Sequence, residues 1–390
     1  MVTNNLKTIA ALTVLSLIAV PSVLAQAPKA KEMASGNVAI PALVDQAAKG
    51  FLKDTPQAVG LSIGVFKDGK TYTYNYGTVE TGKTRLPTAN TLYPLASITK
   101  TFTGILLAQA VIEGKLNLDD DVRKYLDGSY PNLEFQGHPI RLYDLVNHRS
   151  GLPFFLPDKP EASPGYNNEV IPWPTRIGEL LKNYTRADFF ADLHKVKLDA
   201  IPGEKFSYSN AAAQLMGYIL ERVYGKSYEA LVKEKIAGPL KMADTTITLE
   251  NVQRERWARG YDEKGVLMPD TPDQIQAAGA VKSTVADMLK YEEWQLAEQD
   301  EAVKLSHKPI LTDNNYSVGL NWQMMRSGED RLIWQEGNIP GFDSLCINLP
   351  ELKMGLVIFA NEADRSSSHR LTLMANEIMK ALDPRAVPLP

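Results

Sequence analysis

Strand-like hairpins lie near both ends of this 390-residue chain, and they constrain its fold more than any other feature. In the first, Val59–Gly77, apolar residues alternate along one arm and tyrosines along the other, on either side of Asp68-Gly69. This pattern predicts two antiparallel strands joined by a tight turn. A second hairpin is expected over Asp343–Phe359, and a closing helix over Leu371–Leu382.

The segments between the two hairpins are mostly helical in pattern, notably Ala211–Val223 and Thr284–Leu296. The predicted fold class is therefore α/β (α+β): an antiparallel sheet built from both chain ends with flanking helices, plus an inserted, mostly helical region. Within a domain of residues 30–390, the sheet part is expected at about 40–98 and 310–390. The helical part is expected at about 99–309.

The first 27 residues have the pattern of a secretory leader. They contain a single basic residue, Lys7, an apolar run from Ile9 to Val20, and the small-residue pattern Val23-Leu24-Ala25. We interpret residues 1–25 as a cleavable signal peptide, which predicts a periplasmic or secreted protein. No later segment approaches the roughly 20 apolar residues of a membrane span, so none is expected.

Composition excludes several classes of function. The net charge is only −4 and its charges are interspersed, which disfavours a nucleic-acid partner. Cys346 is the single cysteine and has the setting of a buried strand residue, so neither an intramolecular disulfide nor a thiolate metal site is expected. The five histidines lack metal-type spacing, and no metal or cofactor is predicted. The oligomeric state is left open.

The tetrad Ser97-Ile98-Thr99-Lys100 opens a long apolar run that continues through Ile112 and stops at Gly114. Such a run predicts a buried helix with a glycine stop. Residues three apart on a helix share a face, so the Lys100 amine lies within reach of the Ser97 hydroxyl. The tetrad predicts a serine nucleophile that needs no histidine. The alternative is a helix cap followed by a solvated lysine.

Several further segments match motifs of one known superfamily in the correct order. They are residues 94–103 around Ser97, residues 113–120, residues 142–153 ending in Ser150-Gly151-Leu152-Pro153, residues 202–210, and Ala278-Gly279 with residues 283–288. From about Tyr93 to Phe342 the chain thus resembles the serine β-lactamase and penicillin-binding-protein superfamily, in its class C and carboxypeptidase-type branch.

This resemblance implies roles for individual residues. Ser97 forms the acyl-enzyme, Lys100 and Tyr208 transfer its proton, and Asn210 orients the substrate. Three Tyr-x-Asn elements occur, but only the one at Tyr208 has the family's Pro-Gly lead-in and following helix. Which of Lys100 and Tyr208 is the base stays open. The oxyanion hole should use the N–H groups of Ser97 and of a residue near Asn338.

The third family motif, a strand with Lys-Thr-Gly or His-Thr/Ser-Gly, falls at Gln335-Glu336-Gly337, followed by Asn338. We predict that these four residues bind substrate. The cation that helps dock a substrate carboxylate in the family is absent, since Gln335 offers only neutral hydrogen bonds. Glu336 would repel an anionic ligand and could receive an amine. A solvated edge carboxylate is an equal alternative.

The proline-rich stretch 152–174 contains Trp173, which we predict to contact substrate because its surroundings resemble periplasmic members acting on cell-wall peptides. The expected function is hydrolysis of peptide or amide substrates of cell-wall type, as in D-Ala carboxypeptidases and endopeptidases. A family VIII-type carboxylesterase and a weak β-lactamase or non-turnover penicillin-binding protein are the alternatives. A nucleophile elbow at Ser62 is disfavoured, because Ser62 lies inside the first hairpin.

Overall fold

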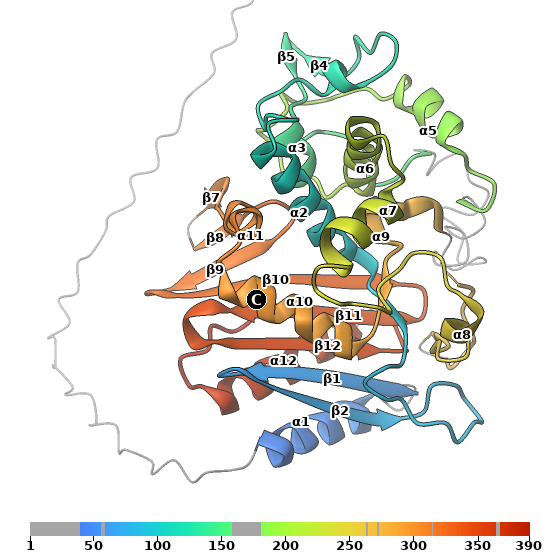
Figure 1. Ribbon diagram of the computed structural model, residues 1–390, viewed down its shortest axis with the longest axis vertical. Coiled ribbons are helices and arrows are strands. Elements are labelled where there is room, and N and C mark those ends of the chain that lie inside the picture. Colours follow the sequence, from blue (N-terminus) through green and yellow to red (C-terminus); the bar gives the residue numbers. More distant parts are fainter. Residues whose placement is uncertain are drawn as a thin grey trace, which may run out of the picture. The chain divides into compact units, whose positions relative to one another are not determined.

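An eight-stranded antiparallel sheet joins the two ends of the chain in the computed structural model (Figure 1). The structure describes residues 40–55, 59–157, 181–262, 264–270, 273–313, 315–363 and 367–390. In spatial order the strands are β2 (Lys70–Gly77), β1 (Gly60–Lys67), β12 (Met354–Ala360), β11 (Phe342–Leu349), β10 (Asp330–Ile339), β9 (Gln323–Ser327), β8 (Tyr316–Val318) and β7 (Leu311–Asp313). The predicted fold class is confirmed.

Both predicted hairpins are present and pair with each other. The first turns at Asp68 and Gly69, whose φ angles of +49° and +78° suit the tight turn that joins two twisted strands. The second turns through the 3-10 segment Pro350–Leu352. Strand β1 pairs antiparallel with β12, with Leu61 opposite Ala360, so the two chain ends form one continuous sheet.

The remaining elements cover the sheet or form the region beside it. The described helices are α1 (Ile40–Asp54), α2 (Thr99–Ile112), α3 (Leu142–Val146), α5 (Arg186–Leu193), α6 (Asn210–Tyr224), α7 (Tyr228–Val232), α8 (Asn251–Arg254), α9 (Gln276–Gly279), α10 (Val285–Ala297), α11 (Glu301–Ser306) and α12 (Ser367–Leu382). Two short strand pairs are β3 (Tyr93–Pro94) with β6 (Lys282–Ser283), and β4 (Glu134–Phe135) with β5 (His138–Pro139).

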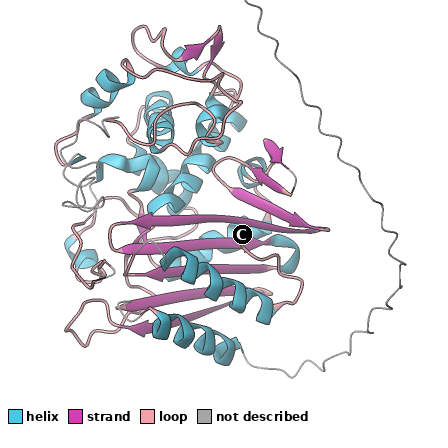
Figure 2. Ribbon diagram, turned by 180° about the vertical axis from the view of Figure 1, so that it is seen from behind, coloured by secondary structure: helices cyan, strands magenta, loops and turns pink. Residues whose placement is uncertain are grey.

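Helices cover both faces of the sheet, so its strands are buried on two sides. Helices α1 and α12 lie side by side on one face (Figure 2), where Leu61, Ile63 and Val65 of β1 join their hydrophobic cluster. Helix α10 packs on the other face against β1 and β12. Helix α10 belongs to the part predicted as the helical insertion, yet it packs on the sheet. A division of the domain near residues 99 and 309 therefore stays a prediction.

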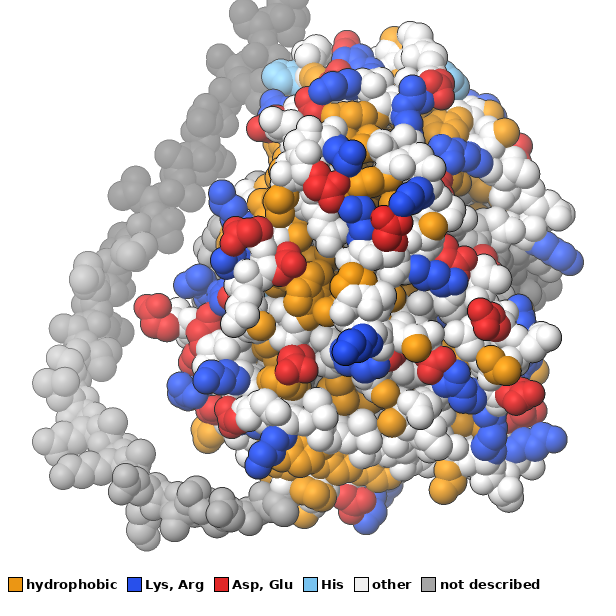
Figure 3. Space-filling model, viewed as in Figure 1, with side chains coloured by type: hydrophobic (Ala, Val, Ile, Leu, Met, Phe, Trp, Pro, Cys, Tyr) orange, Lys and Arg blue, Asp and Glu red, His pale blue; other side chains and the backbone are white. Residues whose placement is uncertain are grey.

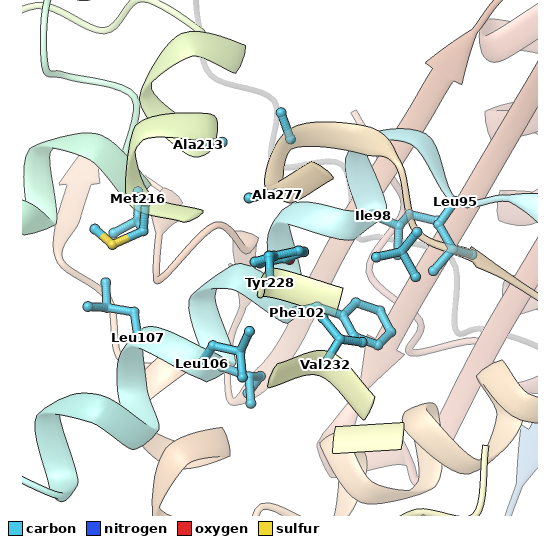
Figure 4. Packing of buried hydrophobic residues seen from close by; sticks show 14 of the residues in the cluster. Leu95, Ile98, Phe102, Leu106, Leu107, Ala213, Met216, Tyr228, Val232 and Ala277 are labelled. Atoms are coloured by element: carbon cyan, nitrogen blue, oxygen red, sulfur yellow. The ribbon is translucent and has the colours of Figure 1, made fainter. Parts of the chain in front are cut away.

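Helix α2 forms the centre of the helical region. It is apolar on almost every side, and it packs against α6, α7, α9 and α11. Figure 4 shows Phe102 and Leu106 near Tyr228 and Val232 of α7. The expected burial of the whole run is wrong at its end, because Ile112 is 53% exposed in the last turn. The rest of α2 is enclosed by other helices, so the helix still forms a rigid support for the residues at its N-terminus.

The surface face in Figure 3 carries basic and acidic side chains interspersed with one another. Among the described residues, no helix is long and apolar enough to cross a membrane. The predicted signal peptide, the Tyr-x-Asn element at Tyr166 and the predicted substrate contact Trp173 lie outside the described residues. Localisation and the absence of a nucleic-acid partner stay predictions.

We expect Gly104→Ala to destabilise the protein, because a Cβ at this position of α2 would overlap the carbonyl oxygen of Leu320. Overpacking of this kind costs about 1–3 kcal/mol. Gly50→Ala in α1 is the matched control, since a Cβ there meets nothing within 4 Å, and it should stabilise the helix by about 0.5–1 kcal/mol. Thermal unfolding measures both, and equal midpoints for the two variants would contradict this packing.

Candidate active site

The hydroxyl of Ser97 lies between two groups that can exchange protons with it. Its Oγ is 2.9 Å from Nζ of Lys100 and 2.7 Å from the hydroxyl oxygen of Tyr208. Ser97 is part of the 3-10 turn Ala96–Ile98 that leads directly into α2. The preceding residue, Ala96, has a φ of +47°, a conformation that non-glycine residues adopt rarely and that is found at many functional sites.

The amine of Lys100 is completely buried among neutral oxygen atoms. In addition to Ser97 Oγ, its Nζ lies 2.8 Å from Oδ1 of Asn210 and 2.7 Å from the carbonyl oxygen of Ala278. Burial lowers the pKa of Lys100 well below its ordinary value, because the ammonium loses its hydration without a compensating carboxylate among the described residues. The neutral amine is therefore much more populated than in a surface lysine.

The phenol of Tyr208 responds to the same burial in the opposite sense. Burial raises the pKa of Tyr208, the hydrogen bond with Ser97 lowers it, and the charge of Glu336 raises it further. The ring of His148 packs on Tyr208 with 4.2 Å between centroids, and burial followed by the charge of Lys100 lowers the pKa of His148 to about 3. Burial thus favours the protonated phenol of Tyr208 and the neutral amine of Lys100.

Hydrogen bonds fix the segment that carries Tyr208 to the loop His148–Phe154. The backbone N–H of Asn210 donates to the carbonyl of Phe154 at 2.9 Å, and the hydroxyl of Ser209 donates to the carbonyl of Pro153 at 2.7 Å. Ser209 also caps α6 by accepting from an N–H of its first turn. On the other side of Tyr208, the backbone N–H of Ser207 donates to the carbonyl of His148 at 2.7 Å, so both neighbours of Tyr208 are anchored.

Strand β10 approaches the nucleophile closely at Gly337. A Cβ at this position would overlap the carbonyl oxygen of Leu95 and the hydroxyl of Ser344, so only glycine fits. The backbone of Asn338 follows directly, while its side-chain amide donates to Asp343 at 2.6 Å. The strand therefore lies beside the turn that carries Ser97. An oxyanion hole formed by the N–H groups of Ser97 and Asn338 stays a prediction.

Gln335 and Glu336 occupy different environments on the same strand. Gln335 is buried, and its amide accepts from Gln323 at 3.0 Å and donates to the carbonyl of Asn321 at 3.4 Å. Glu336 is exposed, and the protein around it raises its pKa by reducing its hydration. A direct contact of Gln335 with substrate stays a prediction, because its amide already has partners within the protein.

Two functional contacts were not predicted from the sequence. The segment Ala278-Gly279 matched a family motif without an assigned role, and the structure shows that the Ala278 carbonyl accepts from Lys100. The matched segment 142–153 likewise carried no assigned role at His148, whose ring packs against Tyr208. Backbone carbonyls leave no residue-type signal, so the first contact could be found only in three dimensions.

A cavity of about 250 Å³ adjoins this centre at Ser207, on the outer side of the Leu152-Pro153 loop. Its lining includes Arg149 and Lys205 but not Ser97. It is therefore separate from the reacting groups. Within the described part of the chain, no three His, Cys, Asp or Glu side chains gather as metal ligands.

The family model described as Beta-lactamase matches residues 43–377, which is most of the chain. The chain belongs to the β-lactamase family. This membership confirms the resemblance identified from the sequence and supports the serine hydrolase class. The solved structure of a class C β-lactamase shares the fold, with a TM-score of 0.74 and 23% identity, over 88% of this chain and 98% of that one.

The relatives in sequence are distant. Protein flp of Staphylococcus aureus (strain N315) is 28% identical over 316 residues, which are 77% of this chain, and the chain spans only 59% of that relative's length. A β-lactamase of Pseudomonas fluorescens is 24% identical over 366 residues, covering 83% of this chain and 94% of that protein. Sequence identities this low do not indicate the substrate of this protein, so its substrate preference is argued from the site itself.

We expect Lys100→Met and Tyr208→Phe each to slow labelling of Ser97 by a fluorophosphonate by about 100-fold or more, because each removes a proton-transfer partner. The double variant should lose far less than the product of the two losses, since both groups act on one hydroxyl. Labelling rates from intact-protein mass spectrometry measure this.

Circular dichroism and thermal unfolding of each variant provide the control for folding. Losses that multiply in the double variant would contradict a single proton-transfer unit.

Proposed function

We propose that this protein is a serine hydrolase that forms an acyl-enzyme on Ser97 and acts on peptide or amide bonds. The observation that carries the proposal is the position of the Ser97 hydroxyl between the buried Lys100 amine and the Tyr208 phenol. The family match supports the same class of reaction. No metal or cofactor takes part in the mechanism proposed below.

The hydrogen bonds of Lys100 suggest how the serine is activated. A neutral amine has two N–H donors and one lone pair. The donors satisfy Asn210 Oδ1 and the Ala278 carbonyl, which leaves the lone pair for the proton of Ser97. Ser97 Oγ then attacks the substrate carbonyl while its proton passes to Lys100. The negative charge of the tetrahedral intermediate is proposed to be held by the N–H groups of Ser97 and Asn338.

Tyr208 completes the acylation step by supplying a proton. As the carbon–nitrogen bond breaks, the Tyr208 hydroxyl protonates the departing amine, and the proton held by Lys100 replaces it. Water then attacks the acyl-enzyme, giving one proton to the same pair and releasing Ser97 and the carboxylic acid. An amine departs poorly without a proton, so a positioned phenol is most useful for amide substrates.

The third-motif strand supports a preference among substrates. Gln335 is neutral and Glu336 is anionic, so these motif residues provide no cation for a substrate carboxylate. We therefore place internal peptide or amide bonds of cell-wall type first, ahead of bonds next to a free terminal carboxylate. Carboxylic ester hydrolysis is the second candidate, because neutral esters need no carboxylate docking. Efficient β-lactam hydrolysis ranks third for the same reason.

The proposed place of action is the periplasm or the medium. Residues 1–25 carry the leader pattern that supports this proposal. A peptide or small-molecule substrate is the proposed partner.

We expect Ser97→Ala to abolish turnover of peptide amides and p-nitrophenyl esters and to remove covalent labelling by fluorophosphonate, because Ser97 is the proposed nucleophile. Intact-protein mass spectrometry decides the outcome. Ser62→Ala is the matched control, since this buried strand residue bonds Asn75 and Tyr93 and is outside the proposed machinery.

An adduct that forms on Ser97→Ala at the rate of the unaltered protein would refute the assignment. Loss of labelling in Ser62→Ala with the fold intact would transfer the nucleophile to Ser62.

A further inference from the structure

The carboxylate of Glu336 lies in the site without a neutralising group. Its side chain is exposed, and among the described residues it has neither a salt bridge nor a side-chain hydrogen-bond partner. Its charge nevertheless acts on the phenols of Tyr208 and Tyr316, raising the pKa of each. An anion without a neutralising partner close to a proton-transfer phenol costs free energy unless a bound cation neutralises it.

The strand around Glu336 is open along one edge. Pairing of β9 with β10 ends at Gln323 and Trp334, so the residues of β10 that follow have β11 on one side only. The backbone N–H of Glu336 is satisfied by the side chain of the neighbouring Gln335 at 3.2 Å. A ligand can therefore approach this edge and meet the Glu336 carboxylate directly.

The relation to Tyr208 indicates which half of a substrate Glu336 meets. Tyr208 is the proposed proton donor to the leaving group, so that group departs beside the phenol. Glu336 influences the same phenol electrostatically, and it lies on the strand that passes the nucleophile at Gly337. Glu336 directly precedes Gly337, which packs against the turn of Ser97, so we assign its carboxylate to the leaving-group half of a bound substrate.

The exposed aromatic side chains next to Tyr208 and His148 suit a cationic ligand that also has apolar surface. Phe154 and Phe206, next to Tyr208 and His148, are 49% and 47% exposed. Arg149 also acts electrostatically on Tyr316, but its guanidinium donates to the carbonyl of Glu204 at 2.7 Å rather than to Glu336. Aromatic faces with a free carboxylate are a suitable environment for an organic ammonium group.

We propose that the site selects substrates whose leaving group carries a cationic amine, and that Glu336 is the residue that selects them. This proposal rests on the acyl-enzyme function proposed above. Under this proposal the third motif does not merely fail to bind a carboxylate: its anionic residue determines specificity by binding a cation. An amine bound there would keep Glu336 ionised, which offsets the reduced hydration of the carboxylate.

Three butyryl thioesters with the same acyl group test the proposal. Their leaving groups are thiocholine, which is cationic, 3,3-dimethylbutanethiol, its neutral isostere, and 3-mercaptopropionate, which is anionic. Thiol release gives kcat and KM for each. We expect kcat/KM for the cationic thioester to exceed that for the neutral one by about tenfold, a ratio that added salt should reduce. In Glu336→Gln the ratio should fall close to one.

Glu329→Gln is the matched control, because this exposed residue lies on the same hairpin about 23 Å along β10 from Glu336 and loses the same charge. Glu329→Gln should keep the same ratio of kcat/KM for the cationic thioester to kcat/KM for the neutral one as the unaltered protein. An unchanged preference for the cationic thioester in Glu336→Gln would overturn the proposal, because another group would then bind the cation. A preference of the unaltered protein for the anionic thioester would also overturn it and favour Arg149 as the docking group. If no thioester is turned over and Ser97 is never acylated, the proposed function itself fails; turnover of all three at equal rates refutes only the role of Glu336.

Discussion

Burial of the Lys100 ammonium, with no carboxylate partner in the described part of the chain, is the constraint on which the site depends. Removing such an ion from water costs several kcal/mol unless it is paired or loses its proton. The structure surrounds Nζ with Ser97 Oγ, Asn210 Oδ1 and the Ala278 carbonyl, all neutral oxygens. The resulting fall in pKa favours the neutral amine, and in the proposed mechanism this amine is the proton acceptor that Ser97 needs in place of a histidine.

The rest of the fold keeps this arrangement dry and rigid. Helix α2 is enclosed by other helices, and the lysine on its first turn has no solvent-exposed surface. The sheet, which joins both chain ends, delivers β10 to the turn at Ser97 through the close approach at Gly337. The loop after His148 anchors Asn210, which in turn accepts from the lysine. Each contact of Nζ therefore comes from a different part of the chain.

Local patterns predicted much of this, and longer-range contacts did not. The hairpins, α6 and α10 follow from alternation and helical periodicity, because those signals lie within one segment. Motif context singled out Tyr208 among three Tyr-x-Asn elements, and the structure places its hydroxyl on Ser97. The Ala278 carbonyl and the burial of Gln335 were missed, since both depend on packing between distant segments. The exposed Ile112 shows that an apolar run in the sequence can extend beyond the part of the helix that the core buries.

A direct titration of Lys100 tests the central claim most sharply. In protein labelled with ¹³C and ¹⁵N at lysine, the Lys100 signal can be assigned by its absence from Lys100→Arg. The account predicts that its ¹³Cε shift titrates well below the ordinary lysine value of 10.5, so that the amine is protonated only at lower pH. If Lys100 titrated at that ordinary value instead, burial would not be the source of the base, and the account would be wrong.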